Sequence, residues 1–207
     1  MDFFDLFQLL YVSLFLVIFL TRTISAILTG NNPFSLGVGK KWMHAVIELS
    51  LLVFLLIWVS EVFKYSLGSS RHILPGAVHR PLFESLPLQY VGVVINVIGM
   101  AIFISALHAF RQSWRMGIDT KNPGDLITRG IFRLSRNPIF LFIDLYFWGT
   151  FMIYSTLFFL VMAVLTCGVL HYQIIKEERF LTEQYKDAYA AYTAKTGRYL
   201  TLLLRTK

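Results

Sequence analysis

The chain has 207 residues, of which 56% are hydrophobic and only 15% are charged. A soluble domain carries about 25% charged residues to cover its surface, so this composition excludes a soluble globular fold. The 19 Phe, 10 Tyr and 4 Trp residues exclude intrinsic disorder, and the single cysteine excludes a disulfide framework and a thiolate metal site. The sequence therefore predicts an integral membrane protein.

Four apolar stretches are long enough to cross a bilayer, which takes about 20 apolar residues. They cover residues 4–21, 45–63, 88–110 and 139–175. The last stretch contains no Lys or Arg and is long enough for two crossings, so we expect a hairpin that turns near Tyr154-Ser155-Thr156. The predicted fold class is all-α, with about five transmembrane helices and a cytoplasmic C-terminal helix.

The distribution of basic residues predicts the orientation in the membrane. With the N-terminus outside, 16 of the 19 Lys and Arg residues fall in cytoplasmic segments, and only Lys64, Arg71 and Arg80 fall outside. The positive-inside rule therefore favours an external N-terminus and a cytoplasmic C-terminus. The formal net charge of +7 is then concentrated on one face, where we expect contact with anionic membrane lipids and not with nucleic acid.

We expect a three-helix membrane region over residues 1–110 and a functional region over 111–207, which begins with a polar cytoplasmic loop. Asn122-Pro123-Gly124 is typical of a turn, Pro138 suits the first turn of a helix, and Asn137 then falls at the helix N-cap. This places a cytoplasmic loop against a helix start, where free N–H groups and the positive end of the helix dipole face water.

A second polar segment begins where the last apolar stretch ends, at Gln173, and contains the adjacent acids Glu177 and Glu178. Apolar and aromatic residues recur after it at helical spacing, namely Phe180, Leu181, Tyr185, Ala188, Tyr189 and Tyr192. One interpretation is an amphipathic helix that lies on the bilayer. The other is a lid over a site whose floor is formed by the two glutamates.

Few polar residues remain inside the apolar stretches, and each is costly there. Among them are Glu48, Asn96, Asp144 and Gln173. We expect Glu48 to reach the headgroup region and Asn96 to form an interhelical hydrogen bond. His44, His108 and His171 fall near the cytoplasmic ends of different helices, a pattern that would also permit a b-type haem.

Taken together, the two polar segments resemble the isoprenylcysteine carboxyl methyltransferase and phospholipid methyltransferase superfamily of integral membrane enzymes. The family pattern joins a Leu-Val/Ile-x-x-Gly stretch, an Arg-His-Pro-x-Tyr box and a Glu-Glu pair ahead of a Tyr-x-x-Tyr helix and Thr-Gly-Arg. The corresponding residues here are 126–132, Arg136-Asn137-Pro138-Ile139-Phe140, Glu177-Glu178, Tyr189, Tyr192 and Thr196-Gly197-Arg198. The resemblance covers roughly residues 112–200.

The resemblance implies a methyltransferase that binds S-adenosylmethionine at the cytoplasmic face. The cofactor contacts that it implies are Leu126, Ile127, Phe132, Arg136, Asn137, Pro138, Phe140, Glu177 and Glu178. Carboxylates suit the cationic amino group of the cofactor, Arg136 suits its carboxylate, and apolar or aromatic side chains suit its adenine. Methyl transfer then needs mainly positioning and exclusion of water.

This sequence departs from the family pattern, and the departures bear on the substrate. Asn137 replaces the usual histidine and Phe140 the usual tyrosine, while Gln173 stands where prenylcysteine enzymes have an arginine that meets the substrate carboxylate. Asp144 lies seven residues beyond Asn137 on the same helix face, where it could hold an amine or accept its proton. The alternative is that Asp144 pairs with Asn96 or with another helix.

The sequence thus predicts a membrane methyltransferase that uses S-adenosylmethionine and methylates a carboxyl or amine group of a lipid-like or hydrophobic substrate. Asp144, Gln173 and Arg198 are the candidate substrate-side residues. We expect no metal and no obligate protein partner. The first competing interpretation is a transport or structural membrane protein. The second is a b-type haem protein.

Overall fold

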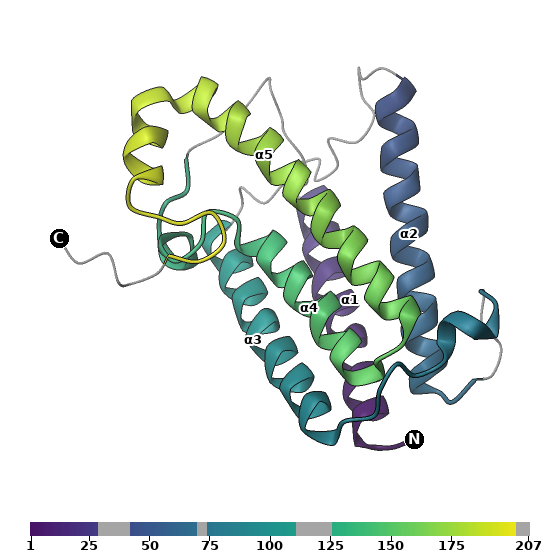
Figure 1. Cartoon of the computed structure of the whole chain (residues 1–207). Helices are drawn as coiled ribbons and strands as arrows, with labels where there is room; N and C mark the ends of the chain where they lie inside the picture. Colours follow the sequence, from purple (N-terminus) through teal and green to yellow (C-terminus); the bar gives the residue numbers. More distant parts are fainter. Residues whose placement is uncertain (29–41, 70–73, 111–125, 202–207) are drawn as a thin grey trace.

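A computed structural model describes residues 1–28, 42–69, 74–110 and 126–201, without the side chains of 42–52. The long helices are α1 (Phe3–Leu28), α2 (Trp42–Ser66), α3 (Leu86–Phe110), α4 (Pro138–Tyr154) and α5 (Leu157–Thr193), and the short 3-10 helices are η1 (Gly76–His79) and η3 (Gly130–Arg133). Successive long helices run in alternating directions (Figure 1). The described residues are therefore all-helical, as predicted, apart from one isolated bridge between Pro81 and Thr156.

The helices have the apolar character that a bilayer requires. By length and composition α1, α3 and α5 are each able to cross a membrane, while α4 is a shorter apolar helix of 17 residues. Large apolar side chains such as Leu10, Val94 and Leu165 are more than half exposed on the outer faces of these helices. Such faces suit contact with lipid and support an integral membrane protein; the number of crossings stays a prediction.

The turn between α4 and α5 lies at the predicted position. Ser155 adopts a left-handed conformation with φ 44°, and its N–H donates to the carbonyl oxygen of Phe151 at 2.6 Å. Thr156 is the N-cap of α5, and its side chain accepts a hydrogen bond from the N–H of Phe159. Because the hairpin is this tight, the beginning of α4 and the C-terminal part of α5 lie at the same end of the bundle (Figure 1).

Glycines bring α3 and α4 into close contact. A Cβ atom at Gly92 would lie 2.6 Å from the carbonyl oxygen of Gly149, and one at Gly149 would overlap the side chain of Asn96. The Asn96 side chain has no hydrogen-bond partner in the described structure, so the predicted interhelical bond of this side chain is wrong. Its backbone carbonyl instead accepts from the Tyr11 hydroxyl at 2.9 Å, which links α3 to α1.

We expect Gly149→Ala to lower the free energy of unfolding by about 2 kcal/mol, because the added methyl group forces two packed helices apart. The matched control is Gly168→Ala on α5, where an added Cβ would meet nothing within 4 Å and where alanine is the better helix former. Thermal unfolding of the purified protein in detergent checks both variants. Equal unfolding midpoints for the two variants would contradict close packing at Gly149.

Candidate functional site

The beginning of α4 has the predicted local structure. Asn137 is the N-cap residue and Pro138 occupies the first helical turn. N–H groups in the first turn have no partner within the helix, so proline loses no hydrogen bond there. The Asn137 side chain does not cap the helix; its backbone N–H donates to the Ser135 hydroxyl at 3.0 Å. The amide of Asn137 is therefore free to point toward α5 and the C-terminal segment.

The segment after α5 packs against the loop before α4. The N–H of Arg136 donates to the carbonyl oxygen of Gly197 at 3.0 Å, and the N–H of Thr201 donates to that of Leu134 at 2.7 Å. Gly197 has no room for a side chain, because a Cβ there would overlap the carbonyl of Leu200. The two polar segments that the sequence singled out thus lie side by side.

Glu178 is the centre of an ionic cluster that joins the loop before α4 to the segment after α5. We call this group the Glu178 cluster; its members are Glu178, Arg136, Arg198 and Asn137. The Arg136 guanidinium donates to Oε1 of Glu178 at 3.1 and 2.9 Å, and that of Arg198 donates to Oε2 at 3.0 Å. The Asn137 amide donates to the same carboxylate at 3.2 Å and to the carbonyl of Arg198 at 3.1 Å. Three residues from two segments that are distant in sequence therefore converge on one carboxylate.

The cluster places one carboxylate between two guanidinium groups. Burial raises the pKa of Glu178, but the hydrogen bonds from Arg198 and Arg136 outweigh it and hold the pKa below its usual value. Arg136 also donates to the carbonyl oxygens of Thr193 and Thr196, at 3.4 and 2.8 Å. Most donors of Arg136 and both oxygens of Glu178 are thus engaged within the protein.

The C-terminal part of α5 is not the single amphipathic helix that the residue spacing predicted. Lys186 leaves the helical conformation, with φ 43° and ψ −116°, and the helix bends there. After the bend, Tyr189 and Tyr192 are buried, and the Tyr192 hydroxyl donates to the carbonyl oxygen of Phe132 at 2.6 Å. Tyr192 therefore links the helix after the bend to η3, and Figure 1 shows how the yellow end of the chain turns back at the bend.

Glu177 lies next to the Glu178 cluster in sequence but has different surroundings. The amide of Gln173, one turn earlier on α5, donates to Oε1 of Glu177 at 3.2 Å. Burial raises the pKa of Glu177, and the hydrogen bond from Gln173 and the charge of Lys176 offset only part of this effect. Glu177 is therefore a half-buried carboxylate that lacks the arginine partners of Glu178.

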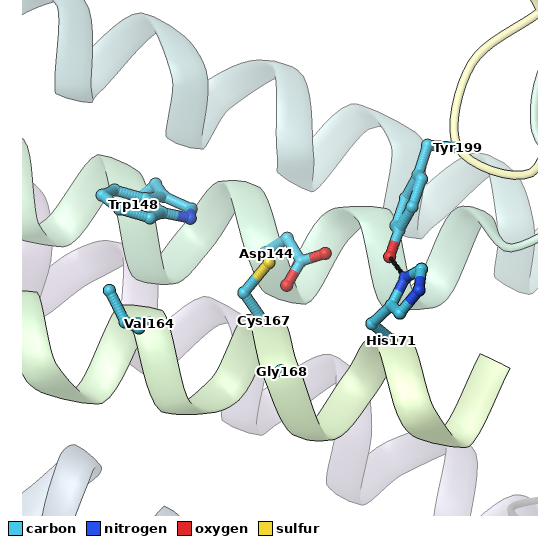
Figure 2. Close-up of a pocket in the computed structure, with 7 residues that line it drawn as sticks. All are labelled: Asp144, Trp148, Val164, Cys167, Gly168, His171 and Tyr199. Atoms are coloured by element: carbon cyan, nitrogen blue, oxygen red, sulfur yellow. Dashed lines mark hydrogen bonds between the residues drawn. The ribbon is translucent and has the colours of Figure 1, made fainter. Parts of the chain in front are cut away.

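Asp144 lines a pocket of about 560 Å³ between α4 and α5. Figure 2 shows Asp144 and Trp148 from α4 beside Cys167 and His171 from α5, with Tyr199 of the C-terminal segment at one end. Oδ1 of Asp144 is buried without a hydrogen-bond partner in the described structure, so the alternative that Asp144 pairs with Asn96 is wrong. The Tyr199 hydroxyl lies 2.8 Å from Nδ1 of His171.

The other predicted cofactor residues surround the beginning of α4. Phe132 is buried, with its ring 5.2 Å from that of Phe110, and Pro138 is also buried. Leu126, Ile127 and Phe140 are half-buried. None of these five residues lines the Asp144 pocket, so their roles as cofactor contacts stay predictions.

Sequence reasoning missed most of the residues that line the pocket. Val164, Cys167, Gly168 and His171 follow a helical spacing of three, four and seven residues, which indicates one face of α5. The helical spacing was visible in the sequence. The packing of α5 against α4, which places this face opposite Asp144, was not. His108 lies elsewhere, beside Arg129, whereas the side chains of His44 and Glu48 lie outside the described residues.

The comparison with family models gives a match over residues 88–188, close to half of the chain, to the phospholipid methyltransferase family. The match covers most of α3, all of η3 and α4, and most of α5, and so includes Arg136, Glu178 and Asp144. No curated protein matches the chain. Residues 88–188 therefore form a phospholipid methyltransferase domain, which belongs to the superfamily of isoprenylcysteine carboxyl methyltransferases and phospholipid methyltransferases.

Proposed function

We propose that this protein transfers a methyl group from S-adenosylmethionine to an amine of a lipid-like substrate, at the cytoplasmic face of the membrane. The family supports methyl transfer to lipid-like molecules. The observation that carries the choice of an amine is Asp144, a carboxylate with an unpartnered oxygen in a largely apolar pocket between two membrane helices. The distribution of basic residues supports the cytoplasmic location.

Glu177 is the residue that best fits the cationic amino group of the cofactor. Its carboxylate is half-buried and accepts a hydrogen bond from the neutral amide of Gln173, so a cation placed beside it would gain a charge-assisted hydrogen bond. When bound, S-adenosylmethionine supplies an already activated methyl group. The protein then has to orient the acceptor and exclude water.

The Glu178 cluster serves this site by holding it together. Because Arg136 and Glu178 bind each other, we reassign both from direct cofactor contact to fixing the C-terminal segment against the beginning of α4. Arg198 has the same role through its ion pair with Glu178. Tyr199, the next residue, is thereby held at the end of the Asp144 pocket.

Asp144 provides the acceptor side of the reaction. An ammonium group carries no lone pair, so it must lose a proton before its nitrogen can bond to a methyl carbon. The Asp144 carboxylate attracts the ammonium group and takes that proton, and the electron pair of the broken carbon–sulfur bond stays on sulfur. Gln173 carries no charge that could neutralise a substrate carboxylate, which favours an amine over a carboxyl acceptor.

The proposal is tested by binding of S-adenosylmethionine to the detergent-purified protein. We expect Glu177→Ala to weaken binding at least tenfold, because the variant loses a charge-assisted hydrogen bond in a half-buried site. Glu183→Ala is the matched control, since Glu183 is an exposed acid farther along α5. Binding that is absent from the folded wild-type protein, or equal in both variants, would overturn the cofactor assignment.

Binding of the cofactor should also depend on pH through Glu177. Its pKa is raised by burial, so the carboxylate becomes protonated at a higher pH than an ordinary glutamate does. We therefore expect affinity to fall as the pH is lowered through this raised pKa, and to stay high above it. Isothermal titration over a pH series checks this, and the acid-side loss should be absent from Glu177→Gln.

A further inference from the structure

A second pocket lies between the end of α3 and the beginning of η3, and it shares no residue with the Asp144 pocket. Its volume is about 540 Å³. The lining residues are Ile104, Ser105, His108, Ala109, Arg129, Gly130 and Ile131. Arg129 and His108 have no hydrogen bond or ion pair within the described structure, whereas Arg136 and Arg198 are both bound to Glu178.

The local backbone keeps this pocket open. Arg129 is extended and Gly130 turns the chain into η3 with φ 62°, a conformation that other residues rarely adopt. The turn brings η3 against the last turns of α3, where a Cβ at Gly130 would lie 3.7 Å from that of Ala109. The turn at Gly130 thus shapes the pocket, in addition to the space left by the missing side chain of this glycine.

The pocket combines an unpaired cation with an apolar wall. Ile104, Ala109 and Ile131 provide the apolar part, and Arg129 and His108 provide the donors. It lies at the end of α3, an apolar helix long enough to cross the bilayer, which puts it at headgroup depth. An arginine at this depth pairs well with a phosphate group.

We propose that this pocket binds the phosphate of an anionic phospholipid of the surrounding leaflet, with Arg129 and His108 as the donors and the glycerol region against Ile104 and Ile131. The site is distinct from the Asp144 pocket, and its occupant is a bound lipid and not the methyl acceptor. The inference does not depend on the proposed methyl transfer.

The test is native mass spectrometry of the full chain, purified in detergent with either phosphatidylglycerol or phosphatidylcholine. We expect the wild type to retain phosphatidylglycerol in preference to phosphatidylcholine, and Arg129→Gln to weaken this retention about fivefold, the usual effect of one basic residue at a membrane surface. Arg133→Gln is the matched control, because Arg133 is also an exposed arginine and lies at the end of η3, but it does not line the pocket.

Three results would overturn the proposal. They are equal retention of the two lipids by the wild type, equal losses in Arg129→Gln and Arg133→Gln, and displacement of the lipid by an equal concentration of inorganic phosphate. The last result would identify a site for free phosphate. Arg129 is exposed, so its replacement leaves the fold intact, and an unchanged unfolding midpoint verifies this.

Discussion

Methyl transfer by the Asp144→Asn variant is expected to fall at least a hundredfold, while binding of S-adenosylmethionine stays unchanged. An amide has nearly the shape of the carboxylate but can neither attract an ammonium group by charge nor take its proton, and such proton transfer typically contributes about 10² to 10⁴ in rate. The measurement is transfer of labelled methyl groups to lipid extract at saturating cofactor.

Two comparisons distinguish a loss of methyl transfer in Asp144→Asn from a loss of folding. Oδ1 of Asp144 has no protein partner, so the variant loses no described hydrogen bond there and should unfold at the wild-type temperature. Thr166→Val on α5 is the matched control: it changes a polar side chain that is likewise buried without a hydrogen-bond partner in the described structure, but Thr166 does not line the pocket. Undiminished transfer by Asp144→Asn would show that Asp144 is not the base.

Replacing Glu178 by alanine is expected to destabilise the protein by about 3 kcal/mol, because two arginines lose the carboxylate between them. The effect comes mainly from Arg136, which is 12% exposed, since Arg198 is 40% exposed and its ion pair is screened by water. Thermal unfolding in detergent checks this against Glu183→Ala, which removes an exposed acid from the same helix.

The same carboxylate gives a pH dependence with a definite sign. The pKa of Glu178 is lowered in the folded protein, so its stabilising effect is complete above the usual glutamate pKa and is lost as the pH falls through the lowered value. The difference in unfolding midpoint between wild type and Glu178→Gln should therefore shrink on acidification. A difference that grows in acid would contradict the ion pairs.

The features that follow from local sequence were predicted well. The hairpin at Ser155 follows from the length of an uncharged apolar run, and the positions of Asn137 and Pro138 follow from the chemistry of helix ends. The closeness of the two polar segments then follows from the hairpin. Each of these predictions needs only one stretch of chain.

The features that were missed depend on distant parts of the chain. Sequence alone gave Glu177 and Glu178 the same role, but adjacent residues on a helix point about 100° apart, and only Glu178 faces Arg136. The bend at Lys186 was missed for the same reason. It accompanies a contact between Tyr192 and η3, two segments that are distant in sequence. Helical spacing describes a face and does not say what that face meets.

The pairing of Leu134 and Arg136 with Thr201 and Gly197 has a consequence for biosynthesis. The five long helices of the described structure end by residue 193, so the segment that completes the Glu178 cluster is the last part of the cluster to be synthesised. Premature termination between residues 193 and 198 would leave the five long helices without Arg198 and Tyr199, and the Asp144 pocket would then lack its end wall.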